Sequence, residues 1–575
     1  MLPTHRTDVL IIGAGGAALR AALEARAEGR DVLVLSKGVA GKGGTTPTAL
    51  TGYQAAFGHA DARDNPDIHY ADTMANGQYL SNPAQARILA EEAPGSVLDL
   101  ERMGVPFQKT EDGRFVQKRL DESQSYPRSV RIGDSLGGPI MRVLRREALR
   151  AGATLRSDVF VSKILVRDGE ARGAVGIDLA TGEVTAFMAG AVILATGGAA
   201  ELFSLSTCPP EATGDGYMLG FDAGARIIDP EFFLFLGHAL LGPPAARGVL
   251  YPFQYLLWLG AKPLYNALGE SFVANYSLDG SGNPSRDVYA RAIFLENRAG
   301  RGSTLGGAYF DPASLPMDVL ERELPSQTRF LRELGLSMRS PIEVGVAGHF
   351  LCGGLEVDED TRTAVPGLFA AGEVAGGLHG AARIGGNALA ELFVFGKRAG
   401  RQAAGWSARQ PGGRAAEAAN ARPGPEDMPE ARREKERLLS LLHASGDLRP
   451  GPVKRRLQEL MSAHAGVIRS GKGLETALDG IRELQSLLPR VAPVHKGSVF
   501  NLEWTDRLEL EAMLGMAGIV ALAALRREES RGSHYREDFP ARSAARHTNT
   551  IVSPGPGGPV LTARPAAAAH PGDTA

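Results

Sequence analysis

The chain has 575 residues, of which 43% are hydrophobic and 22% charged, with a formal net charge of −2. This length exceeds what one hydrophobic core supports, so we expect roughly two to four domains of an ordinary globular protein. The small net charge and the absence of long Lys/Arg runs argue against a nucleic-acid partner. Cys208 and Cys352 are the only cysteines, too few for a disulfide framework, a thiolate zinc site or an iron–sulfur cluster held by this chain alone, and we predict no metal site.

The N-terminal sequence predicts no secretion signal, because its apolar run passes directly into glycines without a cleavage site. The most apolar stretches, such as 519–525, are far shorter than the roughly 20 residues that cross a bilayer. We therefore expect a cytoplasmic protein without a direct membrane span, which reaches the inner face of a membrane, if at all, through a partner.

The first 37 residues carry the pattern of a mononucleotide-binding βαβ unit. An apolar strand over residues 8–13 runs into glycines, and an Ala- and Leu-rich helix and a second strand follow. In Gly13-x-Gly15-x-x-Ala18, the first glycine permits a tight turn, the second lets the backbone approach a pyrophosphate, and the alanine allows close helix–strand packing. The helix N-terminus then directs its amide groups at the phosphates.

Three strand ends are predicted to meet at this nucleotide. The second strand ends in Ser36 and Lys37, where the usual fingerprint has a ribose-binding carboxylate, and Ser36 can supply one hydrogen bond instead. The apolar stretch AGAVILA leads into Thr196 and Gly197, and PGLFAAGE ends in Glu373. Because this acid directly follows an apolar strand and a glycine, we expect it at the ligand rather than in a solvated loop.

The rest of the chain divides by composition. An insertion with aromatic clusters such as YPFQYLLWLG predicts a domain that caps the nucleotide. A Pro/Gly/Ala-rich linker precedes segments with apolar residues three and four apart, which predict helices, and the stretch from VSPGPGGP onward is predicted to be disordered. The expected fold is α/β: a Rossmann-type nucleotide-binding domain (1–234 and 345–408), an inserted α+β capping domain (235–344), a linker (409–428), a helical domain (429–530) and a partly disordered C-terminal segment (531–575).

The stretch LHGAARIGGNAL places His379 and Arg383 among glycines and alanines, with no carboxylate inside it. One interpretation is an ordinary glycine turn with a surface arginine and a core histidine. The other is a cationic site for an anion from outside the chain. This stretch alone leaves both interpretations open.

Ten motifs in order carry a family resemblance: GAGGAALRAALEA, SKG, VILATGG, TGDGYMLGFDAGA, EFFLF, SRDVYARAI, GHFLCGGLEVD, PGLFAAGE, HGAARIGGNAL and ESRGSHYREDFP. Over residues 8–540 the chain resembles the flavoprotein subunits of succinate dehydrogenase and fumarate reductase, a family that includes L-aspartate oxidase. The resemblance implies FAD in the first domain and a mobile cap. It also implies hydride exchange between flavin N5 and one carbon of a dicarboxylate, with a proton moved at the adjacent carbon.

The resemblance implies three catalytic residues. His349 and Arg383 match the family's clamp on a substrate carboxylate, where fixed cations stabilise the negative charge that builds up during reduction. Arg286 matches the proton-transferring arginine, although a guanidinium pKa above ~12 is unusual for a general acid. The alternative for Arg286 is a structural salt bridge to Asp287 or Glu296.

The cofactor is expected to be non-covalent FAD. Covalent members of the family carry a Ser-His-Thr triplet shortly after the second strand, whereas GKGGTTPTALTGYQ contains no histidine. A covalent histidyl bond raises the flavin potential, so its absence favours reduction of fumarate over oxidation of succinate. The resemblance and the fingerprint together give the expected FAD-binding residues as Gly13, Gly15, Gly16, Ala18, Ser36, Lys37, Gly44, Thr45, Gly52, Ala195, Thr196, Gly197, Asp215, Glu373, Asn387, Ala388 and Leu389.

Two departures from the family fall in the capping segment. Leu236 stands where the family often has a substrate-binding histidine, with His238 two positions later. The acid-rich RGEGG segment, which supplies part of the family's proton relay, is represented only by AARGVLYP. Both changes affect the expected site of the second carboxylate and the relay to Arg286.

Three functions are compatible with these residues. The first is a flavoprotein subunit that interconverts fumarate and succinate and exchanges electrons with an iron–sulfur partner. The second is L-aspartate oxidase, which forms iminoaspartate; its Glu-Gly-Gly-His-Ser segment corresponds here to DESQSYPRS, where Asp121 could serve the substrate amine. The third is an FAD-binding electron-transfer protein without dicarboxylate activity, against which the retention of His349, Arg383 and Arg286 argues.

Overall fold

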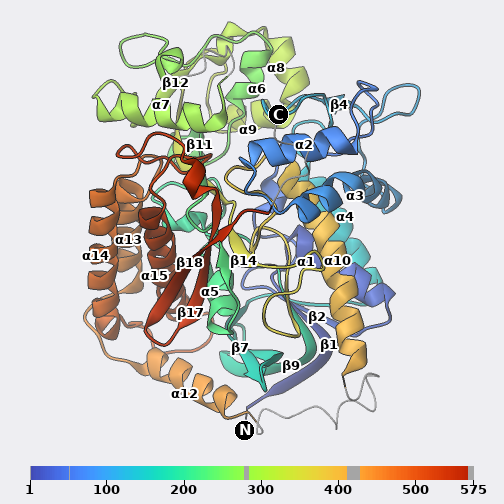
Figure 1. The fold of residues 1–575 in the computed structure, drawn as a ribbon, viewed down its shortest axis with the longest axis vertical. Helices are drawn as coiled ribbons and strands as arrows, with labels where there is room; N and C mark the ends of the chain where they lie inside the picture. Colours follow the sequence, from blue (N-terminus) through green and yellow to red (C-terminus); the bar gives the residue numbers. More distant parts are fainter. Residues whose placement is uncertain (1, 51, 277–283, 411–427, 568–575) are drawn as a thin grey trace.

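The computed structural model describes residues 2–50, 52–276, 284–410 and 428–567. A domain built on a seven-stranded sheet carries a cap at one end, and a group of C-terminal helices lies along one side of it (Figure 1).

β1 (Thr4–Ile12) is a central strand of the sheet, which has the order β6-β2-β1-β9-β8-β7, with β15 beside β9. It runs parallel to β2 and β9, with Val9 opposite Val32 and Ala191. Because helices cover the sheet, its central strands are almost continuously apolar, as the sequence predicted. The remaining strands are β2 (Val32–Leu35), β6 (Thr154–Arg156), β7 (Val159–Arg167), β8 (Glu170–Asp178), β9 (Glu183–Leu194) and β15 (Leu368–Ala370).

α1 (Gly16–Ala27) and α10 (Asn387–Arg409) pack side by side against this sheet (Figure 1). Their contact is built from glycine and alanine: a Cβ on Gly400 would lie 2.2 Å from the carbonyl oxygen of Ala21. Any side chain at that position would therefore push the two helices apart. Around them lie α2 (Pro66–Asn76), α3 (Pro83–Arg102), α4 (Gly137–Arg150) and a small sheet of β3 (Tyr53–Gln54), β4 (Gln117–Lys118) and β5 (Ser129–Val130).

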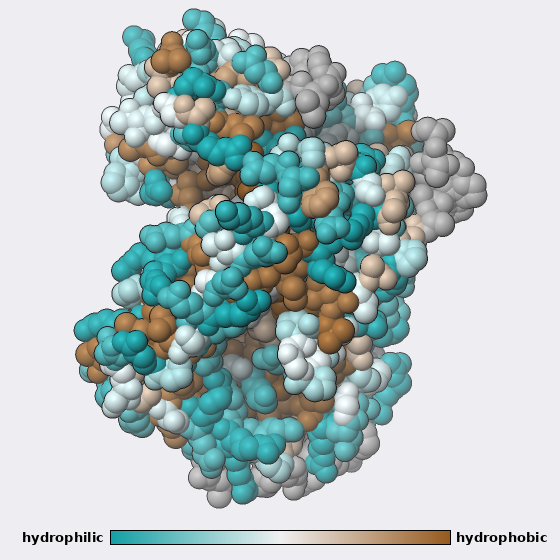
Figure 2. Space-filling model, turned by 60° about the vertical axis from the view of Figure 1, so that its left-hand side comes forward, coloured by the Kyte–Doolittle hydropathy of each residue, from teal (hydrophilic) through white to brown (hydrophobic). Residues whose placement is uncertain are grey.

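Two long antiparallel strands, β11 (Phe233–Leu240) and β13 (Ile342–Leu351), connect the sheet domain to the cap. The hydrophobic cluster of the cap draws on residues from Leu240 to Val344. Figure 2 shows an indentation of the surface between the cap and the body of the protein. The other main elements of the cap are α6 (Phe253–Trp258), α7 (Arg286–Arg298), β12 (Ala308–Phe310), α8 (Met317–Glu323) and α9 (Pro325–Glu333).

The predicted helical domain is confirmed: α13 (Pro450–His464), α14 (Gly471–Leu487) and α15 (Leu502–Arg526) pack together, and α12 (Pro429–His443) contacts the sheet. In the part of the chain that the structure describes, α15 is the one helix with the length and hydropathy of a membrane span. However, 67% of its most apolar window is buried inside the protein, where it packs on α13, α14 and α5 (Asp215–Asp222).

The disorder predicted from VSPGPGGP onward is wrong for residues 552–567. β17 (Thr548–Gly555) and β18 (Gly558–Pro565) form a hairpin, because the Pro/Gly-rich stretch supplies the turn between two strands. The hairpin extends a sheet of order β16-β14-β10-β17-β18. Most of the predicted linker (409–428) and residues 568–575 lie outside the described residues. The other strands of this sheet are β10 (Ile227–Ile228), β14 (Gly354–Glu356) and β16 (Ala375–Gly376).

A buried cluster of charges holds the C-terminal segment to the body. Arg527, just after α15, binds Glu231 Oε1 at 2.5 Å and Glu529 Oε1 at 2.9 Å. It also donates to the backbone carbonyl of Thr548 at 2.8 Å, and Arg531 binds Glu529 at 2.9 Å. The four charged side chains are all buried. One guanidinium group thus joins the last helix, the hairpin and the segment before β11.

Replacing Arg527 with alanine should lower the free energy of unfolding by about 3–5 kcal/mol, because it removes the guanidinium that binds the buried carboxylate of Glu231 and one of the two that bind Glu529. Chemical denaturation followed by circular dichroism measures the loss. The control Arg482→Ala breaks an exposed pair with Asp479 and should change stability by less than about 1 kcal/mol. Equal effects of the two substitutions would contradict this role for the buried cluster.

Candidate active site

A cavity of about 690 Å³ lies at the junction of the sheet domain and the cap. The carboxyl ends of β1, β2, β9 and β15 open into it, and β11, α6 and α7 line it from the cap. Open α/β sheets bind ligands at this edge, and the volume is typical of a small-molecule site.

Gly13 turns the chain sharply from β1 into α1. Its φ is +104°, and a Cβ there would lie 2.1 Å from the carbonyl oxygen of Ala195. The Gly13 amide donates to the Leu35 carbonyl at 2.8 Å, so the ends of β1, β2 and β9 are drawn together. The N-terminus of α1 consequently faces the cavity, a geometry that suits a pyrophosphate.

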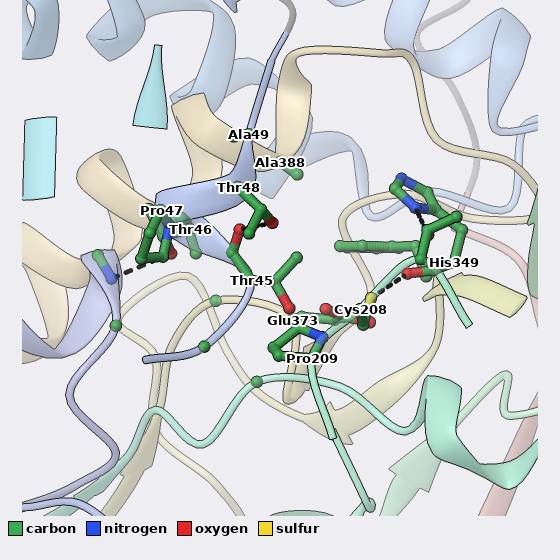
Figure 3. Close-up of a pocket in the computed structure, with 18 of the residues that line it drawn as sticks. Thr45, Thr46, Pro47, Thr48, Ala49, Cys208, Pro209, His349, Glu373 and Ala388 are labelled. Carbon is green, nitrogen blue, oxygen red and sulfur yellow. Dashed lines mark hydrogen bonds between the residues drawn. The ribbon is translucent and has the colours of Figure 1, made fainter. Parts of the chain in front are cut away.

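Hydroxyl groups line the cavity beside this turn. The loop from Thr45 to Ala49 runs along one wall (Figure 3). Thr46 Oγ1 accepts a hydrogen bond from the Gly16 amide at 3.2 Å. Thr196 Oγ1 is buried and has no hydrogen-bond partner within the described residues, so it is free to bind a ligand. The glycine turn, the helix N-terminus and the free hydroxyl fit the phosphate and ribityl groups of FAD.

Lys37 and Asp215 reach the cavity, but their charged groups bind each other. Lys37 Nζ lies 3.2 Å from Asp215 Oδ1 and 2.8 Å from Glu509 Oε1. Burial opposes the charge of Lys37, but the two carboxylates outweigh burial and raise its pKa. The cluster joins the end of β2 to α5 and α15, so it supports the wall of the cavity.

Glu373 is buried after β15, close to Thr45 and Cys208 (Figure 3). Its Oε1 accepts the Leu351 amide at 3.1 Å. Burial raises the pKa of Glu373 to about 8, so a protonated carboxyl group at pH 7 can donate a hydrogen bond into the cavity. Its exposed fraction of 7% excludes the interpretation as a solvated loop acid.

Arg383 and His349 form a buried pair in the cavity. Arg383 Nη2 donates to His349 Nε2 at 3.1 Å, so His349 Nδ1 carries the proton and donates to Thr207 Oγ1 at 2.7 Å. The guanidinium lies 4.3 Å from the ring centre of Phe350. Burial and the charge of Arg383 hold the pKa of His349 well below its usual value, so the imidazole is neutral.

Arg383 and His379, the two cationic residues of LHGAARIGGNAL, lie in different surroundings. Within the described residues, the hydrogen bonds of Arg383 go to His349 and to the Ile384 carbonyl, and its buried Nε has none. His379 turns away from the cavity and binds Glu391 at 3.0 Å. Arg383 is therefore the residue poised for an external anion, and the interpretation as a surface arginine is wrong because it is only 5% exposed.

Arg286 begins α7 and crosses from the cap to the sheet domain. Its Nη2 lies 2.7 Å from Asp121 Oδ2 and donates to the backbone carbonyl of Arg383 at 2.8 Å. Its own amide donates to Glu122 Oε1 at 3.0 Å. Burial alone would lower the pKa of Arg286, but the charges of the two carboxylates raise it by more. The net shift is upward, and the guanidinium stays charged.

Arg286 does form a salt bridge, but its partners are Asp121 and Glu122 and not the expected Asp287 or Glu296. Glu296 binds Arg301 at 2.8 Å instead. Asp121 and Glu122 come from the loop between β4 and β5, more than 160 positions before Arg286 in the chain. Only the folded chain brings these two acids to the arginine.

On the cap side, both Leu236 and His238 line the cavity. His238 stacks on Phe253 with ring centres 4.3 Å apart. Burial lowers its pKa to about 3, and its Nδ1 is buried without a partner in the described residues. A neutral imidazole thus stands close to the position where the family has its substrate histidine.

All the expected site residues except Ala18 and Asn387 line the cavity. Ala18 is fully buried in α1, in the packing layer behind the turn. The Asn387 side chain faces α2, where its Oδ1 lies 2.8 Å from His69 Nε2. Asn387 was predicted as an FAD-binding residue, and this buried hydrogen bond holds its side chain away from the cavity.

Several residues of the cavity were not predicted. Cys208 Sγ donates to the His349 carbonyl at 3.1 Å, and Thr46 braces the glycine turn. No spacing in the sequence marked either of them. The cap side also includes Leu250, Gln254, Tyr255, Trp258 and Phe330; the cluster YPFQYLLWLG was the available signal for most of these.

Comparison with known proteins agrees with this geometry. The family described as FAD binding domain matches residues 8–389, and the family described as fumarate reductase flavoprotein C-term matches residues 454–570. The chain belongs to the succinate dehydrogenase and fumarate reductase flavoprotein family. Its cofactor is FAD, and the predicted family, the fold class and the choice of FAD as cofactor are confirmed.

Members of this family match along nearly the whole chain. The CoM/CoB fumarate reductase of Methanothermobacter marburgensis contains a chain that is 38% identical, over 93% of this chain and 95% of its own length. The fumarate reductase flavoprotein subunit of Mycobacterium tuberculosis is 33% identical, over 94% and 93%. Among solved structures, Mycobacterium smegmatis Sdh1 in complex with UQ1 superposes with a TM-score of 0.87 at 35% identity, over 100% and 96%. FrdA of E. coli quinol fumarate reductase gives 0.89 at 29%, over 99% and 98%.

Gly13→Ala should abolish or strongly reduce flavin binding, because the new Cβ collides with the backbone that follows β9 and the turn must open. The flavin-to-protein absorbance ratio of the purified protein measures this. The matched control is Gly29→Ala, at a glycine with φ +72° but with nothing within 4 Å of the new Cβ. That variant bears only the strain of a left-handed alanine, about 1–2 kcal/mol, and should keep its flavin. Full flavin occupancy in Gly13→Ala would contradict this role for the turn.

Proposed function

We propose that this chain interconverts fumarate and succinate as the flavoprotein subunit of an electron-transferring complex. Bound FAD supplies the hydride chemistry, at its N5 atom. The observation that carries the proposal is Arg383, a buried cation beside neutral His349, with no carboxylate among its hydrogen-bond partners in the described residues. Relatives that are 33–38% identical over more than nine-tenths of the chain are named fumarate reductase subunits.

The pair Arg383 and His349 clamps one substrate carboxylate. An incoming carboxylate replaces the hydrogen bond between the two side chains and accepts from both of them. Arg383 offers two parallel N–H groups, which fix the plane of the carboxylate as well as its charge. His349 donates from Nε2 once its proton has moved from Nδ1, which then accepts from the Thr207 hydroxyl. These donors stabilise the charge that builds up on the carboxylate during reduction.

Arg286 moves the proton at the neighbouring carbon. It is buried, and its Nη2 is fixed between Asp121 and the Arg383 carbonyl. Donation leaves a transient neutral guanidine, which the neighbouring carboxylate of Asp121 disfavours. The lost proton therefore has to be replaced in each turnover.

The second carboxylate is bound from the cap. Leu236 removes the family's histidine, and His238 and Gln254 line the same side of the cavity. His238 Nδ1 is buried and unpartnered within the described residues, so it is available for a substrate oxygen. We assign the second carboxylate to this imidazole and to Gln254, which contribute hydrogen bonds without charge.

Nothing in the described part of the site favours L-aspartate oxidase or a flavoprotein without substrate. The acid expected to serve an amine, Asp121, already accepts from three donors: Arg286, the Gly385 amide at 2.6 Å and the Ser123 amide at 2.9 Å. A substrate ammonium group would have to displace one of these. An electron-transfer protein, in turn, has no need for the buried cationic clamp.

The FAD is proposed to be non-covalent. The wall from Thr45 to Ala49 carries hydroxyl and proline side chains, and the histidines that line the cavity, His238 and His349, engage the cap and Arg383. Denaturation with trichloroacetic acid should therefore release all the yellow colour into the supernatant. Flavin that sediments with the denatured chain would contradict this assignment.

Electrons are proposed to pass to an iron–sulfur partner subunit. Cys208 and Cys352, the two cysteines of the chain, are both buried beside the clamp, and burial raises the pKa of each thiol. They hold no cluster between them, because a cluster needs more ligands. We propose a cytoplasmic location, with the inner face of a membrane reached only through such a partner.

Arg383→Lys should reduce kcat/KM for fumarate roughly 10- to 100-fold, since lysine keeps the charge but loses a charge-assisted hydrogen bond of about 1.5–3 kcal/mol. Oxidation of a reduced viologen by fumarate measures the rate. Arg142→Lys, on the exposed face of α4, serves as the control and should keep the wild-type value. Unchanged kinetics in Arg383→Lys would remove Arg383 from the clamp.

A further inference from the structure

Among the described cap residues that line the cavity, none is an Asp or Glu that could feed protons to Arg286. Residues 232–269 include β11, α6 and the segment AARGVLYP, and they contain no Asp or Glu. Val249 and Leu250, which line the cavity, stand in the segment where the family has its acid-rich relay. If Arg286 gives up a proton in every turnover, as the proposed function requires, the replacement proton needs another route.

Two consecutive acids reach Arg286 from the opposite domain. Asp121 Oδ2 lies 2.7 Å from Arg286 Nη2. Glu122 Oε1 accepts the Arg286 amide at 3.0 Å and lies 3.7 Å from its Nε, which has no hydrogen-bond partner among the described residues. Glu122 Oε2 has one long contact, to Gln254 Nε2 at 3.4 Å. Asp121 therefore contacts the same Nη2 that donates to the Arg383 carbonyl, whereas Glu122 contacts the Nε and the backbone amide of Arg286.

We propose that Glu122 is the proton-relay residue that returns a proton to Arg286 after each reduction, with Asp121 positioning the guanidinium. This role rests on the proposed function, because it acts through Arg286. It moves the relay from the cap, where the family has it, to the loop between β4 and β5 of the sheet domain.

Solvent access distinguishes the two acids. The Asp121 side chain is 1% exposed and its oxygens are occupied by Arg286 and by two backbone amides. The Glu122 side chain is 12% exposed, and one of its oxygens has a weak partner. Glu122 is therefore the group that can exchange protons with water.

The surroundings of Glu122 raise its pKa, which favours this exchange of protons. Two adjacent carboxyl groups face one guanidinium, so the second carboxyl group ionises against the charge of the first. Burial, then the charge of Asp121, raise the pKa of Glu122 to about 7, against the opposing effect of Arg286. The other titratable groups nearby are Tyr289 and Asp287 on α7, the latter close to Asp121 and Arg286. A protonated Glu122 is thus available at neutral pH.

The proton balance is simple. Arg286 donates a proton to the substrate carbon as hydride reaches the adjacent carbon, and becomes a neutral guanidine. The Glu122 carboxyl group gives its proton to that guanidine, and the carboxylate formed takes a proton from water. Together one hydride and one proton convert fumarate to succinate. In succinate oxidation each proton transfer runs in reverse.

Glu122→Gln should lower kcat for fumarate reduction at least 10-fold between pH 6 and 8. In the wild type, kcat should fall as pH rises through about 7, because the protonated carboxyl group is the donor; the variant should lose this dependence. The dissociation constant of succinate, measured from the flavin spectrum, should stay within about 2-fold. Glu122→Asp, which retains a carboxyl group, should recover part of both the rate and the pH dependence.

The matched control is Glu323→Gln, which removes a carboxylate at the same junction of cap and sheet domain, where Glu323 binds Lys118 at 2.7 Å. Its pH profile should follow the wild type. An unchanged pH profile and kcat in Glu122→Gln would overturn the relay. If Glu122→Gln fails to fold, the wild-type enzyme decides: a kcat that does not depend on pH near 7 would also overturn the relay. A wild-type enzyme with no activity on fumarate or succinate would instead contradict the proposed function.

Discussion

The central constraint on this structure is the burial of two guanidinium groups at one junction. Arg286 comes from the cap and Arg383 from the sheet domain, and Arg286 donates to the backbone carbonyl of Arg383. Removing two cations from water is costly, and Asp121 pairs directly with only one of them. Burial and then the charge of Arg383 lower the pKa of His349, and burial and then the charge of Arg286 lower the pKa of Arg383 itself. In the proposed function, a dianionic substrate would offset this unpaired positive charge. Because the two arginines lie on different domains, such a substrate would also link its binding to the contact between cap and sheet domain.

The buried histidines and Glu373 near the clamp are held neutral, which leaves Arg286 and Arg383 as the main charges there. Burial keeps His349 and His238 unprotonated and Glu373 largely protonated at pH 7. The charged side chains of Lys37 and Asp215 neutralise each other in the wall. A cavity with this distribution of charge can select ligands by their charge at the clamp and by their shape and hydrogen bonds at the cap. It suits a reaction in which negative charge moves onto a fixed carboxylate.

Much of the fold and of the clamp could be predicted from the sequence. The apolar runs before Gly13 and Thr196 predict strands because buried parallel strands have few polar residues, and the motif order pointed to Arg383 and His349. The C-terminal hairpin was missed, since Pro and Gly mark both turns and disorder, and only pairing of β17 with β10 decides between them. The ion pair of Arg286 with Asp121 was missed for a different reason. Local spacing favoured Asp287 and Glu296, whereas the real partner depends on how two domains meet, which no local pattern contains.

The role of the cationic clamp in binding a four-carbon dicarboxylate can be tested by anaerobic single-turnover experiments on the intact flavoprotein. The FAD is reduced photochemically, mixed with fumarate in a stopped-flow instrument, and followed by its absorbance near 450 nm. We expect rapid and complete reoxidation by fumarate, saturating with concentration, and reduction of the oxidised enzyme by succinate but not by L-aspartate. Reduction by L-aspartate with no response to fumarate or succinate would show that the clamp serves a different substrate.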